Sequence, residues 1–520
     1  MQQDVFGQHG LAIPYQSLAD LLETYNDRDP SKVAITDVDN DVSVTYGELY
    51  RQVNDIAARL KALGVTKGSK VLLLSDECLE KLILWLGIWR IGAVCCPLNI
   101  EMNFGHLKEL SETVAPTLIL HHVDIDCSQI AHLAQCIPFV TSRAEEQAAR
   151  PAGEFFASVA AGAGADQSLL PERNLPEDMS CIFCTSGTTS KPKIVVYDHA
   201  AYWLCGLSTI DMLGLTAEDR TLEYRSVGWN SAQVLSLMPM LQLGLSLHMA
   251  RRFSHSRFFE WIQKYQITFS AGVPTVVNML LNKPMGYTAK DIPSLKRMTC
   301  STAPLSPEQW VKFETMYGVQ LLQLYGMSEA GWICGNRHYS FKLGTVGLPA
   351  LHQEFEIVDG EGNPCPPGVE GEVTIGGPQT ALGTMKEDGS IDPVRGLRTK
   401  TGDLAIMDEE GYVRVTGRTK DLIIRGGMNI SPVEVDAVIA NAPDVLEGAC
   451  VGAPDPIYGE EVVAFVVKKA AGLTEEQVIE YCKGQLPFAK VPKRVYFLDQ
   501  LPRSDRGKVL RDKLRDLLPS

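Results

Sequence analysis

Apolar and polar positions along the first 140 residues alternate between the spacing of helices and the spacing of strands. Residues 45–63 place apolar side chains at helical spacing, which predicts an amphipathic helix with Leu49, Val53, Ile56, Ala57 and Leu60 on one face. Residues 70–74 form an apolar run that predicts a buried strand, and a helical pattern follows over residues 77–91. Further short runs predict strands at 93–97, 117–121 and 137–141. This alternation predicts a largely parallel sheet covered by helices.

The same rhythm returns in the middle of the chain and then gives way to two other patterns. Strand-like runs recur at residues 221–224, 245–248, 268–271, 297–300 and 319–324. After about residue 331 the runs become short and are separated by turn-forming stretches such as DGEGNP and DEEG, which predicts a small antiparallel β unit over about residues 331–416. From residue 421 the two patterns mix again, with helices expected at 432–440 and 475–486 and strands at 449–451 and 462–468.

These patterns predict an α/β fold with two domains. A large N-terminal domain over residues 1–419 would hold the βα sheets and the β unit, and a smaller α+β domain would occupy residues 420–520. A chain of 520 residues is long enough for about three units of typical domain size, so we expect some of these units to be fused.

The charge balance and the apolar content narrow the class of protein. The chain carries 48 Lys and Arg against 63 Asp and Glu, a net charge of −15, so no general nucleic-acid-binding surface is expected. The most apolar stretch, residues 82–98, is interrupted by Arg90 and is too short for a membrane span of about 20 residues. The first residues, MQQDVFGQHG, lack the pattern of a signal peptide. Thirteen scattered cysteines are typical of reduced thiols, and these features together predict a cytoplasmic protein.

Cys181 and Cys184 have the CxxC spacing that occurs at redox and metal sites. The sequence offers neither a second CxxC pair nor a nearby histidine pair to complete a zinc site. Because the pair lies in the apolar run CIFC, packing inside a buried strand is the favoured interpretation.

The strongest chemical signal directly follows that run, in the segment TSGTTSKPK at residues 185–193. Small, hydroxyl-bearing and basic residues after a strand can surround a polyphosphate with N–H, O–H and ammonium groups. The segment lacks the GxxxxGK[ST] order of a Walker A loop. It closely resembles the phosphate loop of the adenylate-forming superfamily, which includes the acyl-CoA synthetases. Ser190 and Ile194 stand where that family usually has glycine.

Seven other segments resemble motifs of the same family and occur in the family's order. They are VTYGEL at 44–49, STAPL at 301–305, YGMSE at 325–329, TGD at 401–403, GRTKD at 417–421, RGGMNISPVE at 425–434 and PRSDRGK at 502–508. The resemblance therefore extends over about residues 15–515 and implies the acyl-CoA synthetase branch of the superfamily.

The resemblance implies a binding site for ATP and Mg²⁺. Phosphate contacts would come from one loop, through Thr185, Ser186, Gly187, Thr188, Thr189 and Lys193. Adenine and ribose would be held by residues of further motifs, namely Ser301, Thr302, Ala303, Tyr325, Gly326, Asp403 and Arg418. Ser328 and Glu329 would act at the reaction centre, and Glu329 would hold Mg²⁺, because a hard cation prefers carboxylate oxygen.

The resemblance also implies a C-terminal domain that moves. Lys508 would meet the acid and the α-phosphate during adenylation, where a positioned ammonium stabilises developing negative charge. Lys420 would be the hinge about which the domain rotates between two half-reactions. Gly426 and Gly427 would let the backbone approach the pantetheine of coenzyme A closely.

The expected pocket for the acid departs from the family pattern. It would be lined by Trp229, Asn230, Val273 and Thr275, and Trp229 stands where many members have histidine. A tryptophan wall would favour aromatic, cyclic or short-to-medium-chain acids over long fatty acids. Arg225, four residues before Trp229, would share its face on a strand and could pair with a second carboxylate of a diacid. The favoured interpretation of Arg225 is a structural ion pair.

As a whole, the resemblance implies an ATP-dependent carboxylate–CoA ligase that forms acyl-AMP and then acyl-CoA, with release of pyrophosphate and AMP. Its partners would be a small carboxylic acid, ATP and coenzyme A, and a homodimer stays open. No carrier-protein motif follows before Ser520, which favours CoA as acceptor over the alternative, a stand-alone ligase that loads an acyl carrier protein. From another class, a non-catalytic acyl- or nucleotide-binding sensor is disfavoured by the joint presence of Lys508, Glu329 and Asp403.

Overall fold

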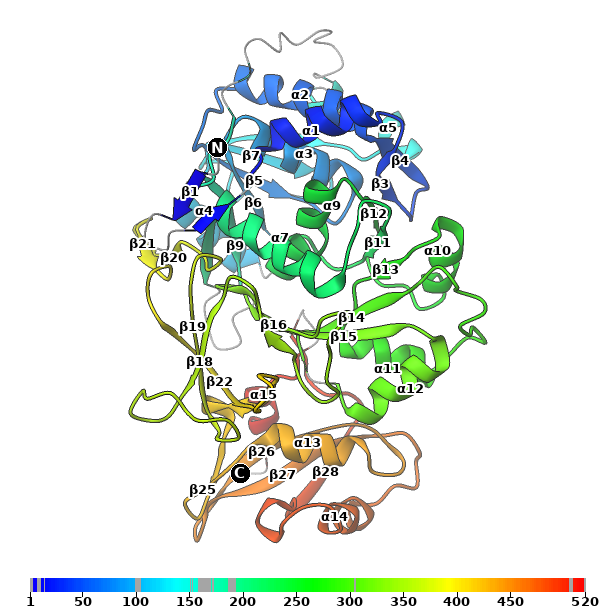
Figure 1. The fold of residues 1–520 in the computed structure, drawn as a ribbon, viewed down its shortest axis with the longest axis vertical. Helices are drawn as coiled ribbons and strands as arrows, with labels where there is room; N and C mark the ends of the chain where they lie inside the picture. The colour runs from blue at the N-terminus through cyan, green and yellow to red at the C-terminus, as the bar shows by residue number, and fades with distance from the viewer. Residues whose placement is uncertain are drawn as a thin grey trace.

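The computed structural model describes residues 3–6, 11–13, 15–98, 104–149, 151, 153–157, 170, 173–185, 193–303, 305–504 and 508–518. Figure 1 shows a large body formed by the N-terminal part of the chain and a small C-terminal domain beneath it. The large body contains two wide mixed sheets, a four-stranded sheet and the short pair β1 (Gln3–Phe6) and β2 (Leu11–Ile13). The α/β fold class expected from the sequence is confirmed.

The first wide sheet has eight strands in the order β21-β20-β10-β9-β6-β5-β7-β8. The strands from β9 to β8 are parallel, as the alternation in the sequence predicts, while β10, β20 and β21 continue the sheet antiparallel. Their bounds are β5 (Lys70–Leu74), β6 (Val94–Leu98), β7 (Leu118–His122), β8 (Gln135–Phe139), β9 (Met179–Cys184), β10 (Ile194–Asp198), β20 (Gly383–Met385) and β21 (Ile391–Pro393).

The second wide sheet has nine strands in the order β17-β16-β15-β14-β13-β11-β12-β3-β4. Its central strands, from β15 to β3, are parallel, and both edges are antiparallel. Their bounds are β3 (Val33–Asp37), β4 (Val42–Thr45), β11 (Arg220–Glu223), β12 (Ser246–Met249), β13 (Phe269–Ser270), β14 (Arg297–Ser301), β15 (Gln320–Met327), β16 (Gly331–Gly335) and β17 (Leu348–Pro349).

Helices connect and cover the strands of these two sheets. The helix predicted over residues 45–63 is α2 (Tyr46–Ala62), and it begins where Thr45 and Glu48 form a reciprocal capping box. The other helices of the large body are α1 (Leu18–Arg28), α3 (Leu79–Arg90), α4 (Phe104–Val114), α5 (Ala144–Ala148), α7 (His199–Leu213), α8 (Asn230–Ala232), the π-helical turn η2 (Gln233–Leu237), α9 (Met238–Leu243), α10 (Phe258–Tyr265), α11 (Pro274–Asn282) and α12 (Pro307–Tyr317).

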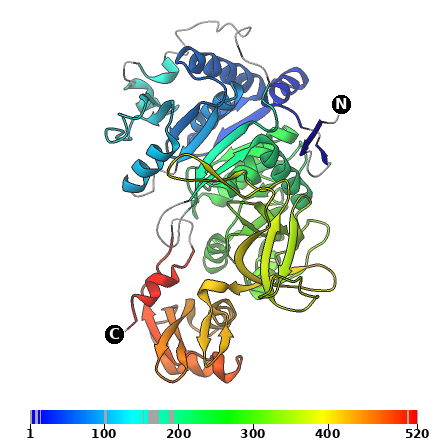
Figure 2. The ribbon, with the colours of Figure 1, turned by 90° about the vertical axis from the view of Figure 1, so that its left-hand side faces the viewer.

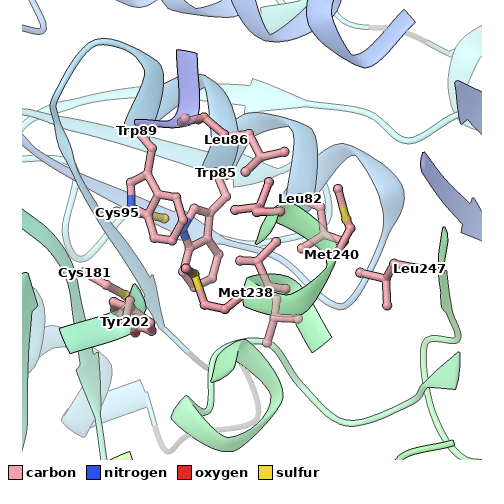
Figure 3. Close-up of a cluster of buried hydrophobic side chains, with 14 of the residues drawn as sticks. Leu82, Trp85, Leu86, Trp89, Cys95, Cys181, Tyr202, Met238, Met240 and Leu247 are labelled. Carbon is pink, nitrogen blue, oxygen red and sulfur yellow. The ribbon is translucent and has the colours of Figure 1, made fainter. Parts of the chain in front are cut away.

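The largest apolar core joins the two wide sheets. Eleven of the twelve residues of α3 are buried, including Trp85 and Trp89, which explains why apolar residues occur on all sides of this helix. Figure 3 shows these indole rings beside Tyr202 of α7 and Met238 of α9. The Trp89 indole N–H donates to the Ser180 carbonyl at 2.7 Å, so the ring is oriented as well as buried.

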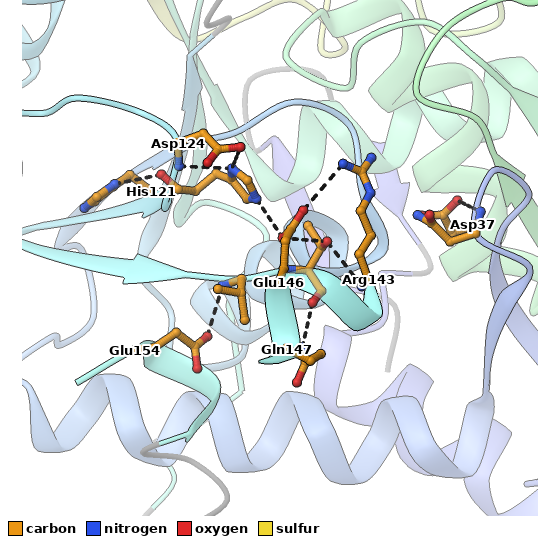
Figure 4. A network of polar contacts seen from close by, with 11 residues as sticks. Asp37, His121, Asp124, Arg143, Glu146, Gln147 and Glu154 are labelled. Carbon is orange, nitrogen blue, oxygen red and sulfur yellow. Dashed lines mark hydrogen bonds and ion pairs between the residues drawn. The ribbon is translucent and has the colours of Figure 1, made fainter. Parts of the chain in front are cut away.

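A polar network fixes the segment that follows β8. The Glu146 carboxylate accepts hydrogen bonds from the Thr141 N–H at 2.7 Å and lies 3.0 Å from His122 Nε2, and Arg143 Nη1 lies 3.4 Å from its second oxygen. Glu154 accepts from the Val140 N–H at 3.2 Å. Figure 4 shows Arg143 reaching towards Glu146 of the short helix α5, with Glu154 in a separate contact nearby. The network ties the end of the first sheet to the segment that leads away from it.

The β unit expected over residues 331–416 is smaller than predicted. Four strands form a separate antiparallel sheet, namely β18 (Glu354–Val358), β19 (Gly371–Gly376), β22 (Thr399–Met407) and β23 (Val413–Arg418). The strands β16 and β17 extend the second wide sheet, and β20 and β21 extend the first. Hydrogen bonding to an open sheet edge decides this assignment, and turn-forming sequence does not reveal which edge a hairpin joins.

The small C-terminal domain lies below the large body in Figure 2. Its sheet has the order β25-β24-β27-β26, with β28 beside β27, and the strands are β24 (Ile423–Arg425), β25 (Met428–Ile430), β26 (Val445–Asp455), β27 (Gly459–Lys468) and β28 (Arg494–Leu498). Its helices are α13 (Pro432–Ala440), α14 (Glu475–Lys483) and α15 (Arg511–Arg515), with the 3-10 turns η3 (Thr419–Asp421) and η4 (Phe488–Lys490). A hydrogen bond from the Ser431 hydroxyl to the Thr416 carbonyl joins the domain to β23.

The two cysteines of β9 agree with the sequence-based expectation. All thirteen cysteines are free thiols. Cys181 and Cys184 are buried on β9, as the core-packing interpretation predicts. Within the described ranges, no helix combines the length and the apolar character needed to cross a membrane.

Candidate active site

The second wide sheet has four parallel strands, β11, β13, β14 and β15, whose carboxyl ends lie side by side. This line of strand ends, and not an outermost strand, is called the edge from here on. In open α/β sheets, ligands bind outside the carboxyl ends of the strands. The expected acid-pocket residues follow β11 and β13, and the expected adenine residues follow β14 or lie at the end of β15. Because neighbouring strands lie about 4.8 Å apart, this edge brings the two groups of residues close together.

Asp403 on β22 receives hydrogen bonds from two other strands. The phenol of Tyr325 on β15 donates to Oδ2 at 2.6 Å, and Nε of Arg418 on β23 donates to Oδ1 at 2.6 Å. The Asp403 carboxylate is buried, and its own backbone N–H donates to Thr401 Oγ1 at 3.1 Å. Each carboxylate oxygen can accept a further hydrogen bond, so the group is oriented but still able to receive hydroxyl groups of a ligand.

The titration behaviour of the two donors supports this arrangement. Burial raises the pKa of the Tyr325 phenol well above its usual value of 10, and the neighbouring Asp403 carboxylate raises it further. Burial alone would lower the pKa of Arg418, but attraction and hydrogen bonding to Asp403, together with the charges of Asp421 and Tyr325, raise it. Tyr325 therefore stays a neutral donor and Arg418 stays a cation near neutral pH.

Lys193 and Glu329 face each other at the entrance to the expected phosphate loop. Lys193 Nζ lies 3.5 Å from Glu329 Oε1, with the lysine side chain 68% exposed and the glutamate side chain 10% exposed. The Thr185 N–H donates to the Lys193 carbonyl at 2.9 Å, and the Lys193 N–H donates to Thr185 Oγ1 at 3.1 Å. The two ends of the loop are thus joined beside Glu329. The predicted phosphate contacts between them, Ser186, Gly187, Thr188 and Thr189, lie outside the described residues.

The backbone that carries Ser328 and Glu329 is held from two sides. The Tyr197 phenol on β10 donates to the Ser328 carbonyl at 3.0 Å, and the Ala381 N–H donates to the Glu329 carbonyl at 2.9 Å. Just before this turn, a Cβ on Gly326 would lie only 2.3 Å from the Gly331 carbonyl oxygen. Glycine at 326 therefore allows β15 to lie close to the start of β16, beside the turn that presents Glu329.

Ser301 is the last residue of β14 and Thr302 and Ala303 follow it, next to the strand that carries Tyr325. Ser301 is buried, and its hydroxyl has no hydrogen-bond partner in the part of the chain that the structure describes. Thr302 has φ +78°, a conformation that a β-branched residue adopts only under constraint. Strained backbone of this kind clusters at functional sites, and here it adjoins Tyr325.

The four expected acid-pocket residues lie after two adjacent strands. Trp229 is half-buried directly before α8, and Asn230 is buried at its start. Val273 directly precedes α11, and Thr275 lies in the first turn of that helix, both half-buried. Because β11 and β13 are paired, the structure brings these two segments to the same part of the edge.

The expectation that Arg225 shares a strand face with Trp229 is wrong. The strand β11 ends at Glu223, and residues 224–229 form a loop. Arg225 is buried, and its Nε and Nη2 donate to the two carboxylate oxygens of Glu223 at 2.8 and 2.7 Å. The structural ion pair, which the sequence analysis favoured, is the arrangement observed. The period of two applies only while the chain stays extended, and here it does not.

Sequence reasoning missed a second buried ion pair, which lies beside the loop that carries Trp229. Lys81 is fully buried and donates to Glu77 Oε1 at 2.7 Å, and the Ser226 hydroxyl donates to the same oxygen at 2.6 Å. The i,i+4 spacing of Glu77 and Lys81 was the only sequence signal, and it also fits an exposed helix pair.

The C-terminal site residues lie in exposed or half-buried positions. Lys508 is half-buried before α15, and its carbonyl accepts from the Ser504 N–H at 2.8 Å. Lys420 is exposed within η3. Gly426 and Gly427 form the turn between β24 and β25, with φ of +56° and +81°, values that favour glycine.

Comparisons with known proteins agree with this geometry. A family model of AMP-binding enzymes matches residues 22–384, and a model of the C-terminal domain of AMP-binding enzymes matches residues 434–508. The chain is 30% identical over 512 residues to an indoleacetate–CoA ligase of Aromatoleum aromaticum, covering 96% of this chain and 98% of that protein. It is also 30% identical over 507 residues to an oxalate–CoA ligase of Arabidopsis thaliana, covering 95% and 97%.

A solved structure extends the likeness to three dimensions. ATP-bound MatB from Rhodopseudomonas palustris has a TM-score of 0.85 to this chain at 26% identity, covering 96% of this chain and 99% of that chain. Sequence motifs, fold and family models therefore agree. The chain belongs to the AMP-binding enzymes of the adenylate-forming superfamily, in the acyl-CoA synthetase branch.

Proposed function

We propose that this chain is an ATP-dependent carboxylate–CoA ligase. The observation that supports it best is the placement of the Tyr325–Asp403–Arg418 array and the Lys193–Glu329 pair at the edge where the expected acid pocket also lies. The array around Asp403 suits a nucleoside, the Lys193–Glu329 pair suits phosphates, and the expected pocket suits an acid. The named relatives, ligases that join indoleacetate or oxalate to CoA, support the same reaction class.

The reaction has two steps. In the first, a carboxylate oxygen of the acid attacks the α-phosphorus of ATP, and the bond from that phosphorus to the bridging oxygen of pyrophosphate breaks. In the second, the sulfur of coenzyme A attacks the acyl carbon, the bond from that carbon to the AMP oxygen breaks, and the thiol proton is lost. The products are acyl-CoA, AMP and pyrophosphate.

The nucleotide would bind through the array around Asp403. The two ribose hydroxyls would donate to the Asp403 oxygens, which Tyr325 and Arg418 already hold in place. The adenine would lie against Tyr325 and the strained backbone of Thr302, with the unused hydroxyl of Ser301 close by. Because these side chains are already oriented before the nucleotide binds, less conformational entropy is lost on binding.

The phosphates would lie between the 185–193 loop and Glu329. The Lys193 ammonium, which is mostly exposed, would donate to phosphate oxygen, and the Glu329 carboxylate would hold Mg²⁺. No group of three or more metal-binding side chains occurs among the described residues. A single carboxylate that shares the cation with phosphates and water is the usual protein arrangement for Mg²⁺, so Glu329 fits this role. The cation would neutralise charge on the phosphates.

The C-terminal domain would supply different residues to the two steps. We propose that it comprises residues 420–520 and rotates about Lys420, while residues 1–419 hold the nucleotide. Lys508 would stabilise charge at the α-phosphorus in the first step. The exposed hairpin turn at Gly426 and Gly427 would approach pantetheine in the second step, because glycine leaves room for close contact.

The half-buried ring of Trp229 supports an aromatic, cyclic or short-to-medium-chain acid. Its indole, placed directly before α8, would wall the acid space. The relatives at similar identity act on acids as different as indoleacetate and oxalate, so identity alone does not choose among acids. Trp229→Ala should shift the ranking of kcat/KM towards longer acids. If palmitate is the best wild-type acid, or if the ranking stays unchanged, Trp229 does not set the choice.

One assay separates this proposal from its alternatives. Pyrophosphate release is measured with benzoate, phenylacetate, indoleacetate, hexanoate, palmitate and succinate, each with and without CoA. A CoA ligase gives acid-dependent pyrophosphate and, with CoA, acyl-CoA and AMP. A ligase for an acyl carrier protein gives the adenylate but no acyl-CoA, and a non-catalytic sensor releases no pyrophosphate with any acid.

A further inference from the structure

The loop of residues 226–230, here called the pocket loop, is fixed by a contact between the two wide sheets. Glu77 lies between β5 of the first sheet and the start of α3. The pocket loop, in contrast, follows β11 of the second sheet. The Ser226 hydroxyl donates to Glu77 Oε1 at 2.6 Å across a sequence separation of 149 residues. The position of the loop therefore depends on a side chain far from it in the sequence.

Glu77 is held in turn by Lys81, one turn further along. Lys81 has no exposed surface, and its ammonium donates to Glu77 Oε1 at 2.7 Å and to the Ser75 carbonyl at 3.1 Å. Glu77 is itself buried. Ion pairs this deep lose hydration on folding, and a well-packed apolar pair of the same size is often at least as stable. Global stability therefore gives no reason for a lysine and a glutamate at these positions.

The Ser226 side chain that contacts Glu77 is also hydrogen-bonded to the backbone of the pocket loop. The Ser226 hydroxyl, which donates to Glu77, also accepts from the Gly228 N–H at 3.1 Å, and the Ser226 carbonyl accepts from the Trp229 N–H at 3.1 Å. One hydroxyl thus links the buried carboxylate to the turn that presents Trp229. Loss of this link would free the turn without removing any side chain from the acid pocket.

Two further contacts near the loop lie within its own layer. The Gln233 side chain donates to the Val227 carbonyl at 2.7 Å, and Arg225 is paired with Glu223 of β11. Gln233 begins the π-helical turn η2, and such turns occur often at functional sites. Among the described residues, Glu77 thus adds a contact from the first sheet to those that set where the loop lies over the edge.

We propose that Glu77, held by Lys81, is a positioning residue that sets which acids the enzyme selects, a role that rests on the proposed ligase function. It touches neither acid nor nucleotide. It fixes the pocket loop through Ser226, and the loop fixes the Trp229 wall of the acid space. Loosening the loop changes the fit of bulky, ring-bearing acids more than that of flexible chains, since a ring needs a wall in one defined place.

Two variants test this without leaving a buried charge unpaired. Ser226→Ala removes the hydroxyl and keeps the Glu77–Lys81 pair, and the double variant Glu77→Leu/Lys81→Met replaces the pair with apolar side chains of similar size. The matched control is Glu112→Gln, which breaks the exposed i,i+4 pair with Lys108 on α4. The readout is the ratio of kcat/KM for indoleacetate to kcat/KM for hexanoate, together with KM for ATP.

Ser226→Ala and the double variant Glu77→Leu/Lys81→Met should each change the ratio of the two kcat/KM values at least fivefold, with KM for ATP within twofold of wild type. The control should change neither quantity. Hydrogen exchange of the amides of residues 226–230 should be faster in both variants, which reports the loop independently of activity. An unchanged ratio, or unchanged exchange, overturns the proposal. A wild-type enzyme that releases no pyrophosphate with any acid contradicts the ligase function instead, so the two failures are distinct.

Discussion

The phenol of Tyr325 and the carboxylate of Asp403 lie 2.6 Å apart, although 78 residues separate them in the sequence. The contact joins the end of the second wide sheet to the four-stranded sheet that follows it. Asp403 also receives the Arg418 guanidinium from β23. Binding of a nucleoside here would therefore depend on how the two sheets are placed relative to each other.

Replacing Asp403 with asparagine should weaken nucleotide binding. The amide keeps the size of the carboxylate but lacks one acceptor, and it leaves the Arg418 cation without its partner. A hydrogen bond to a charged group contributes about 1.5–3 kcal/mol, so KM for ATP should rise at least about tenfold. Tyr325→Phe, which retains the ring and removes only the hydroxyl, should have a smaller effect. A KM for ATP within twofold of wild type in Asp403→Asn would show that this array does not bind the ribose.

Lys508 should matter for adenylation far more than for thioester formation. Lys508→Ala should lower acyl-AMP formation by the roughly 10²–10³-fold typical of losing an electrostatic donor at a transition state. Synthetic acyl-AMP plus CoA should still give acyl-CoA at a near wild-type rate. The two rates are measured separately by quenched-flow chromatography. Equal loss in both steps would contradict the assignment.

A proline at position 420 should separate the two half-reactions. Lys420 lies in the 3-10 turn η3, between β23 and β24. Proline fixes φ near −65°, so a backbone rotation at this residue would be blocked. Lys420→Pro should form acyl-AMP and stall before the thioester, whereas Lys420→Ala should complete both steps. If the proline variant loses both steps together, the residue does not act as the hinge.

Acid should destabilise the fold through His199. This side chain is buried on α7, with Nε2 2.9 Å from the Asn174 amide, and burial lowers its pKa from 6.5 to about 4. Between pH 6.5 and pH 4 the unfolded chain binds a proton that the folded chain does not, so the free energy of unfolding decreases as the pH falls. At pH 5 the loss from this one group amounts to about 2 kcal/mol relative to pH 7.

The measurement is the midpoint of thermal unfolding at pH 7 and pH 5. The decrease should be smaller in His199→Gln than in wild type, because glutamine does not titrate. His248, whose pKa burial also lowers to about 4, supplies a second, independent site with the same sign. If wild type and His199→Gln show the same dependence on pH, His199 does not couple protonation to folding.

Local patterns in the sequence predicted the elements that depend on local spacing. The helix α2 begins beside its capping box at Thr45, and the buried cysteines of β9 pack as the apolar run indicated. The strand expected at 137–141 lies two residues earlier, as Gln135–Phe139. Element ends depend on pairing partners that short windows do not contain.

Long-range contacts explain what the sequence could not predict. Arg225 and Trp229 were expected on one strand face, but the chain leaves β11 at Glu223, where the Glu223–Arg225 pair and Ser236 fix a loop. The Glu77–Ser226 contact depends on the packing of two sheets against one core. Through resemblance, the motifs indicated which residues are expected to form the site, while the tertiary packing determines how those residues are held.

The central claim, formation of an acyl-adenylate from a free acid and ATP, is tested most directly by isotope exchange. The measurement is the incorporation of labelled pyrophosphate into ATP in the absence of CoA, with each acid of the panel. Exchange should require both an acid and Mg²⁺ and should be strongly reduced in Lys508→Ala. Exchange that is absent with every acid, or that proceeds equally well without any acid, would contradict it.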